Sequence, residues 1–400
     1  MKRLRFLRSL VFVFALLGGF ATIGAASASG AGLRPLVPSA AGGWAVQPTP
    51  NATGTPPNSL SAVSCASQRS CVAVGQESVL NVPLVEGWDG RAWSVQPSAV
   101  PSGSDDSFLS GASCTGTRSC MAVGSAFQIH LGTSVTLSEA WDGRSWALQP
   151  TGNPNGAAQS ILSAVSCTSR RSCVAVGHAS SAQGVQVPLA ETWDGRTWTV
   201  QPITGPIGSS DSALSGVSCA SKRSCIAVGQ SVAASGVVTL AESWDGTQWR
   251  AQPTPIPAET HNDDLLGVSC TSKTACTAVG VAALVSNGQN LPLAESWDGR
   301  VWSVQPTPIP TGSSDTVLQG VSCTSKNACT AVGDTSNLAT PPVTVAEAWN
   351  GTAWTVQPTP HPGLESVLLG ASCTSRTTCA AVGEFFPTNV NFAALAEHHT

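Results

Sequence analysis

The chain repeats one pattern of short apolar segments, four to a unit, separated by turn residues. Leu318–Cys323, Cys225–Gly229, Leu189–Trp193 and Trp198–Pro202 are examples of the four segments. Segments of this length, rich in Val, Ala and Trp and bounded by Gly, Pro, Asp or Ser, are typical of β-strands. Helix-period apolar patterns are absent after the first thirty residues. The pattern therefore predicts an all-β protein.

The repeat has a clear period. The motif S-C-x5-C-x-A-V-G occurs seven times, and L-A-E-x-W-D-G-x-x-W-x-V-Q-P lies between copies, best seen at 293–306. The period of 49 to 53 residues suits one four-stranded propeller blade and is too short for an immunoglobulin-like domain. Asp-Gly predicts a hairpin turn between the third and fourth strands. The proline that ends the fourth strand puts this strand at the outer edge, because proline donates no hydrogen bond.

The two ends of the repeat region complement each other. Residues 44–48 (W-A-V-Q-P) form a fourth strand with no earlier strands, and residues 395–397 (L-A-E) form a third strand with no fourth. Trp44 precedes Cys65 by 21 residues, the spacing found between Trp302 and Cys323. The sequence thus predicts a single seven-bladed β-propeller over residues 44–400, four antiparallel strands per blade, closed by strand 44–48 completing the last blade.

The unit resembles a kelch-type repeat. A glycine ends the second strand (Gly229), a Trp lies at the end of the third (Trp193), and a Trp opens the fourth (Trp198). It departs from kelch in its single glycine, in Trp as the third-strand aromatic and in its Cys pair. The Trp-Asp dipeptide is also found in WD-repeats, but their Gly-His partner is missing.

The resemblance implies a propeller and no particular activity. Some kelch-type propellers are copper oxidases whose radical cofactor needs a tyrosine, and sialidase-like propellers use a tyrosine nucleophile. This chain contains no Tyr, which argues against both activities.

The first 28 residues predict a secretory signal peptide. Four basic residues precede an apolar run that ends near Ala26-Ser27-Ala28, a small-x-small cleavage pattern. The alternative, a membrane anchor, is disfavoured because Gly18, Gly19 and Gly24 break a short run. Residues 29–43 are expected to be a linker, and the mature protein is expected to be secreted, with no later membrane span.

All 14 cysteines lie in the seven C-x5-C pairs, which indicates a disulfide framework in an exported protein. Zinc binding is the alternative, but seven two-cysteine sites without matching His residues make poor tetrahedral sites. We expect each pair to crosslink the first two strands of its unit: Cys65 and Cys71, Cys114 and Cys120, Cys167 and Cys173, Cys219 and Cys225, Cys270 and Cys276, Cys323 and Cys329, and Cys373 and Cys379.

No catalytic or metal-binding constellation emerges from the repeat. The six His residues occupy unrelated positions in the units, and no nucleophile triad or phosphate-binding loop is present. The glutamate of L-A-E occurs in every unit, which favours a structural role: accepting hydrogen bonds from backbone or indole N–H groups between blades. These residues are Glu86, Glu139, Glu191, Glu242, Glu295, Glu347 and Glu397.

Basic residues gather at one end of the predicted blades. The chain has 19 Lys and Arg against 23 Asp and Glu, and four of the basic residues lie in the signal, which leaves 15 and a mature net charge of −8. Thirteen of these 15 lie in hairpins between strands 1 and 2 or strands 3 and 4, with five turn aspartates, so this end carries a net +8. The candidate basic face comprises Arg69, Arg118, Arg171, Arg223, Lys273, Lys326 and Arg376.

The opposite loops hold acids and no Lys or Arg. Five residues share the position eight before the first Cys of a unit and are expected near the channel mouth, where hard cations such as Ca²⁺ would find oxygen ligands. These candidates are Asp106, Asp211, Asn262, Asp315 and Glu365.

Two functions fit this charge pattern. The first is a non-enzymatic extracellular protein, expected to be a monomer, that docks an anionic envelope polymer or a protein ligand through the basic face. The second is a hydrolase or lyase acting on saccharides or small molecules at the acidic mouth. A third reading is that the hairpin cations only keep the protein soluble. No specific nucleic-acid partner and no required cofactor are expected.

Overall fold

The computed structural model describes residues 43–50, 57–206, 208–337, 339–387 and 391–400. These residues form 28 β-strands and, within the ranges just given, no helix. The predicted signal peptide (1–28) and all but the last residue of the predicted linker (29–43) lie outside the described residues. No described helix is long and apolar enough to cross a membrane.

The strands fall into seven groups of four, numbered here in chain order. Groups 1 to 4 are β2 (Asn58–Ser67), β3 (Ser70–Glu77), β4 (Val82–Trp88), β5 (Trp93–Val95); β6 (Asp106–Gly116), β7 (Ser119–Gln128), β8 (Thr133–Trp141), β9 (Trp146–Leu148); β10 (Gln159–Ser169), β11 (Ser172–Ser180), β12 (Gln186–Trp193), β13 (Trp198–Gln201); β14 (Asp211–Ser221), β15 (Ser224–Ala233), β16 (Gly236–Trp244) and β17 (Trp249–Gln252). Groups 5 to 7 are β18 (Thr260–Ser272), β19 (Ala275–Leu284), β20 (Asn290–Trp297), β21 (Trp302–Gln305); β22 (Asp315–Ser325), β23 (Ala328–Ser336), β24 (Val343–Trp349), β25 (Trp354–Gln357); and β26 (Glu365–Ser375), β27 (Thr378–Phe386), β28 (Ala393–His399) with β1 (Trp44–Gln47).

Within each group, successive strands pair antiparallel in the order first to fourth. A single parallel bridge between Gln159 and Ser134 joins groups 2 and 3 into one eight-stranded sheet, and the other groups are separate four-stranded sheets. Each predicted strand is present. The second and third strands are longer than predicted, because their pairing continues to the tip of the hairpin, as at Ala233 and Gly236.

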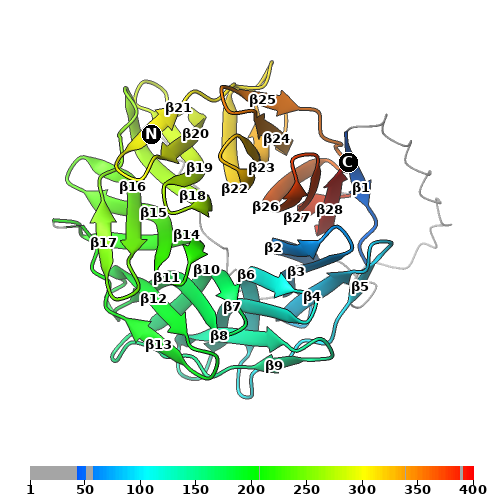
Figure 1. Ribbon diagram of the computed structural model, residues 1–400, viewed down its shortest axis with the longest axis vertical. Helices are drawn as coiled ribbons and strands as arrows, with labels where there is room; N and C mark the ends of the chain where they lie inside the picture. The colour runs from blue at the N-terminus through cyan, green and yellow to red at the C-terminus, as the bar shows by residue number, and fades with distance from the viewer. Residues whose placement is uncertain (1–42, 51–56, 207, 338, 388–390) are drawn as a thin grey trace, which may run out of the picture. The chain divides into compact units, whose positions relative to one another are not determined.

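The first strand completes the last group. β1 pairs antiparallel with β28, with Trp44 opposite His399 and Gln47 opposite Ala396, and lies beside it in Figure 1. The expected pairing of residues 44–48 with residues 395–397 is therefore confirmed along β1.

The core lies between consecutive groups. Val72 and Val74 of group 1 pack against Leu109 and Trp146 of group 2, and the same arrangement recurs along the chain. Second strands are buried almost throughout, whereas fourth strands bury only their first Trp. This difference arises because a second strand is covered on both faces and a fourth strand lies at an edge.

The glycine of C-x-A-V-G lies opposite a β-bulge in the first strand. The register shifts between Leu60 and Ala62 on the first strand, opposite Gly75. A Cβ on Gly75 would lie 2.0 Å from the carbonyl oxygen of Ser59, so only glycine fits. Gly177 has the same 2.0 Å approach, to the carbonyl oxygen of Ile161.

The serine of S-C links neighbouring groups. In every unit the N–H of the first cysteine donates to the serine hydroxyl oxygen of the preceding group, at 2.9 Å. Cys114 bonds Ser64 in this way, and Cys65 bonds Ser372. The seven bonds thus connect each group to the next and group 7 back to group 1.

The predicted disulfides are confirmed. All seven pairs are bonded within their units, across residues directly opposite each other on the first two strands, as Cys167 and Cys173 are. No described cysteine is free.

Candidate functional site

Two hairpins meet at one end of each group. The indole N–H of Trp193, at the end of a third strand, donates to the carbonyl oxygen of Arg170 in the hairpin between strands 1 and 2, at 3.2 Å. Groups 1, 2, 5 and 6 make the same bond. The hairpin between strands 1 and 2 and the turn between strands 3 and 4 therefore share an end, which we call the hairpin end.

The hairpin cations occupy two positions. Arg69, Arg118, Arg171 and Arg223 pack their stems over the glycine of the Asp-Gly turn; a Cβ on Gly195 would lie 2.7 Å from Arg171 Cγ. Lys273, Lys326 and Arg376 stand one residue earlier. All seven are exposed.

The described ion pairs leave these cations unpaired. Within the residues that the structure covers, the ion pairs join His130 to Asp105 at 3.9 Å and Arg250 to Asp245 at 3.4 Å. None of the seven hairpin cations takes part, so their charges face solvent.

The turn aspartates are held differently. Asp142 Oδ1 accepts hydrogen bonds from the backbone N–H groups of Ser145 and Arg144, at 3.0 and 2.8 Å, and these bonds lower the pKa of the carboxyl group. The positive charges of Arg144 and Arg170 lower it further. The aspartates are therefore ionised parts of the turns.

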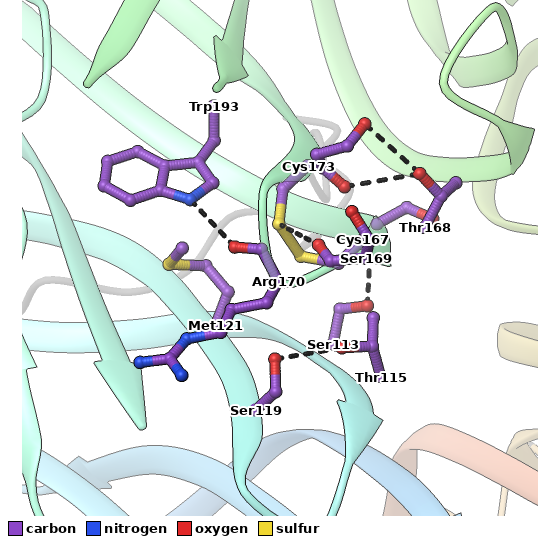
Figure 2. The surroundings of a disulfide bond; sticks show 12 residues. Ser113, Thr115, Ser119, Met121, Cys167, Thr168, Ser169, Arg170, Cys173 and Trp193 are labelled. Atoms are coloured by element: carbon purple, nitrogen blue, oxygen red, sulfur yellow. Dashed lines mark hydrogen bonds between the residues drawn. A yellow bond between two sulfur atoms is a disulfide. The ribbon is translucent and has the colours of Figure 1, made fainter. Parts of the chain in front are cut away.

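A cavity of about 450 Å³ lies at the hairpin end between groups 2 and 3. Group 2 contributes Met121, Ala140 and Trp141, with the Asp142 turn; group 3 contributes the Arg170 hairpin, its disulfide and Trp193. Arg170 lines this cavity together with Met121 and Ser119 of group 2, and all three are labelled in Figure 2. We call this space the open seam.

Hydroxyl groups line the open seam. Ser113 Oγ accepts a hydrogen bond from the N–H of Cys167 at 2.9 Å, and the hydroxyls of Thr115 and Ser119 lie 2.9 Å apart (Figure 2). Ser113 therefore uses one lone pair of its hydroxyl oxygen to accept this bond, and its O–H can still donate to another acceptor. The Trp141 and Trp193 indole N–H groups are already bonded to carbonyl oxygens, so these rings offer only carbon surface.

Ser138 changes the bonding beside the open seam. Its hydroxyl accepts the indole N–H of Trp198 at 3.1 Å, a bond that the Gln ending the preceding fourth strand accepts in groups 1, 2, 6 and 7. Gln149 instead folds back onto the carbonyl oxygen of Ala147 at 3.0 Å, as Gln201 and Gln252 fold back onto their own strands. The corresponding third-strand position holds Ala or Val in every other unit.

The equivalent space between groups 7 and 1, here called the closed seam, is nearly filled. Its volume is about 10 Å³. His398 stands where group 2 has Ala140, and Gln47 reaches across to accept the indole N–H of Trp93 at 2.8 Å. One larger side chain and one glutamine thus replace the cavity.

The predicted mouth residues are bonded to neighbouring groups. Asp106 accepts from the Gln76 side chain at 2.6 Å, and Asp211 and Asp315 accept from backbone N–H groups at the start of the preceding third strand, at 2.6 and 3.0 Å. Asn262 adopts a left-handed φ of 57°, and Glu365 is exposed. These contacts make Asp106, Asp211 and Asp315 links between groups, each at a different seam.

The suggested cation site gains no support at the mouth. The described residues contain no group of three or more His, Cys, Asp or Glu side chains placed to hold a metal ion.

The repeated glutamates are buried, as a structural role requires, but their partners differ from the expectation. Glu139 accepts from Ser98 Oγ and Ala99 N–H, and Glu191 accepts from Gly152 N–H, all in the segments that connect groups. The expected indole donors are wrong: the strand-4 indoles with a partner bond Gln or Ser138 instead.

Proline explains the unpartnered glutamates. Where Ala99 and Gly152 donate, the Q-P-T-P versions of the connection place Pro50, Pro255, Pro308 or Pro360, which have no N–H. Both carboxylate oxygens then lack a partner in Glu86, Glu295, Glu347 and Glu397. Burial raises the pKa of these four groups to about 8, and of Glu191 to about 7.

This arrangement of strands has counterparts among solved structures. YCF48 from Cyanidioschyzon merolae is similar at 12% identity with a TM-score of 0.52, covering 89% of this chain and 99% of that one. A polysaccharide lyase of family PL25, an ulvan lyase, is similar at 8% identity with a TM-score of 0.51, covering 84% and 95%. The fold is a β-propeller.

The likeness extends to the fold alone. No family model and no curated protein sequence matches the chain. The kelch-type resemblance of the propeller's repeat therefore remains a resemblance.

Proposed function

We propose that the chain is a secreted, monomeric, closed seven-bladed propeller that binds an anionic polymer through its hairpin end. The serine-to-cysteine bonds that return from group 7 to group 1, and the pairing of β1 with β28, support a closed seven-bladed ring. Seven disulfides and the apolar leader favour an exported protein. In this reading the kelch-like repeat serves as a scaffold.

The unpaired hairpin cations carry the proposal. All seven lie at the same end of their groups, all are exposed, and none forms an ion pair among the described residues. A cation in an ion pair with an acidic residue of the protein attracts a ligand only weakly. Unpaired cations on one side of the protein attract a polyanion over roughly a Debye length, about 8 Å at physiological salt. An anionic envelope polymer presents the repeated charge that such a surface fits.

Retention on a column of immobilised heparin or teichoic acid tests this proposal. The wild-type protein should bind at low salt and elute as salt rises. Replacing Arg69, Arg118, Arg171 and Arg223 together with Gln should abolish retention, and replacing the same four with Lys should preserve most of it. Retention that is indifferent to salt and to the Gln variant would reject the proposal and favour a role in solubility.

A saccharide-cleaving enzyme is the second candidate. One observation favours it, a set of acidic residues with raised pKa values in group 5. Burial raises the pKa of Asp264 to about 7. Burial and the negative charge of Asp263 raise the pKa of Glu295 to about 8. A propeller lyase also shares the fold. New reducing ends released from acidic polysaccharides by wild type, and lost in Asp263→Asn, would support this candidate.

A further inference from the structure

We infer that the open seam is a subsite for a single saccharide unit that carries a carboxylate or sulfate group, an inference that rests on the proposed binding of an anionic polymer. Its volume of about 450 Å³ falls in the range of small-ligand sites, roughly 300 to 1,000 Å³. The closed seam, at about 10 Å³, has room for one water molecule at most.

The charges around the open seam suit an acidic group at one side. Arg170 and Arg171 belong to group 3, and Asp142 faces them from group 2. Asp142 and the arginines form no ion pair within the described residues. An acidic group beside Arg170 would gain the charge-assisted hydrogen bonds that the protein itself leaves unmade.

The other lining groups suit the rest of a sugar. Asp142 has one oxygen occupied by its turn and a second that can accept a sugar hydroxyl. Ser113 keeps an O–H to donate, and the carbon surface of the half-buried Trp141 ring can cover the C–H face of a sugar ring.

Other ligand classes fit less well. Inorganic sulfate or phosphate would satisfy Arg170 and leave most of the cavity unfilled. An apolar molecule would leave the arginines, Asp142 and the serines facing carbon, and unmade polar contacts of this kind cost about 1 to 3 kcal/mol each. A sugar acid combines all the required features, since it has an anionic group, hydroxyls and a C–H face.

Calorimetric titration of the full chain with short saccharides tests the inference. The probes are a disaccharide with a uronic carboxylate, a matched disaccharide with a sulfate ester, the matched neutral disaccharide and inorganic sulfate. We expect one or both acidic disaccharides to bind, which identifies the acid, and the neutral disaccharide and inorganic sulfate to bind at least about tenfold more weakly. Equal affinity for the neutral disaccharide or for inorganic sulfate would overturn the inference.

The repeat supplies matched variants. Arg170→Ala should weaken binding of the acidic disaccharide by about tenfold or more, and Lys222→Ala, at the same position of the next hairpin, by less than about twofold. Ala140→His should abolish binding, because it installs the residue that occupies this position in the closed seam. Since that seam already accommodates His398, the variant is expected to fold, as thermal melting can verify.

Ser138→Ala is the second way to fill the cavity. It removes the acceptor of Trp198 and restores the residue found in five other units, so Gln149 should turn inward to accept the indole N–H, as Gln305 and Gln357 do in groups with Ala at this position. Unchanged affinity in both Ala140→His and Ser138→Ala would overturn the subsite. If the polymer column still depends on the hairpin arginines while no acidic disaccharide binds, the subsite fails and the proposed function stands. If the column does not depend on them, the proposed function fails.

Discussion

The open and closed seams are built from the same repeat and differ in a few side chains. At the closed seam, Gln47 bonds Trp93 and His398 fills the remaining space; at the open seam, Ser138 takes the bond of Trp198, and Ala140 is too small to fill the gap. The backbone is the same in both, including the serine-to-cysteine bond at 2.9 Å. The repeated backbone of the propeller, here called the frame, is therefore common to both seams, and side chains that depart from the repeat form the cavity.

The largest expected effect tests whether the frame is indeed shared. Gly75→Ala in group 1 and Gly177→Ala in group 3 should each lower the free energy of unfolding by about 3 kcal/mol or more, because the added Cβ meets a carbonyl oxygen at 2.0 Å. Gly116→Ala, with open space around it, is the control and should change the free energy by less than about 0.5 kcal/mol. Urea denaturation measures all three. A near-neutral Gly177→Ala beside a disruptive Gly75→Ala would show that the frames differ.

The buried glutamates give the next effect. Burial raises the folded-state pKa of Glu86, in group 1, to about 8 from an ordinary value of 4.5. The folded state therefore keeps a proton that the unfolded chain has lost, and stability should fall as pH rises from about 5 to 8, by about 1 kcal/mol per pH unit for this group. Glu86→Gln should remove that part of the slope.

Glu191, the equivalent residue of group 3, is the matched comparison. It accepts a hydrogen bond from the N–H of Gly152, and its pKa is about 7. Glu191→Gln should therefore remove a smaller part of the loss of stability with rising pH, and this part should be complete near pH 7. Urea denaturation at pH 5, 6, 7 and 8 checks both. A wild-type protein that grows more stable over this range would contradict the assignment.

Removing the glutamines should separate the two seams. Gln47→Ala leaves the buried indole N–H of Trp93 without an acceptor and should cost about 1 to 3 kcal/mol. Gln149→Ala removes a side chain bonded only to its own strand and should cost less than about 0.5 kcal/mol. Equal losses in thermal or urea denaturation would remove the explanation given for the cavity.

The smallest effect should be equal at both seams. Ser372→Ala and Ser113→Ala each remove the acceptor of a cysteine N–H at 2.9 Å and should each cost about 1 kcal/mol. A much larger loss for one of them, in the same denaturation experiment, would show that one seam depends more heavily on this bond.

The frame could be predicted from the sequence because its determinants repeat. The Cys pairs, the Asp-Gly turns and the unmatched strand at residues 44–48 each constrain pairing directly, and the structure has these elements where they were expected. The role of the repeated serine was missed, because a contact between adjacent groups leaves no period other than that of the repeat itself. The role of the repeated glycine was missed because the bulge that requires it lies in the paired strand of the same group.

The cavity could not be predicted in the same way. Its surroundings include Ser138 in place of Ala or Val, a difference that is visible in the sequence but cannot be interpreted until the positions of Trp198 and Gln149 are known. The mouth carboxylates show that a shared position in the repeat does not by itself form a common site. Asp106, Asp211 and Asp315 share a position in the repeat, yet each is bonded to its own neighbouring group.

Hydrogen–deuterium exchange with and without a long acidic polysaccharide tests most directly which end of the propeller binds. Protection is expected at the hairpins between first and second strands, strongest around residues 114–120 and 167–173, with no change at residues 259–264, at the opposite end of group 5. Protection confined to that opposite end, with the hairpins unchanged, would contradict binding at the hairpin end and move the function to the acidic end.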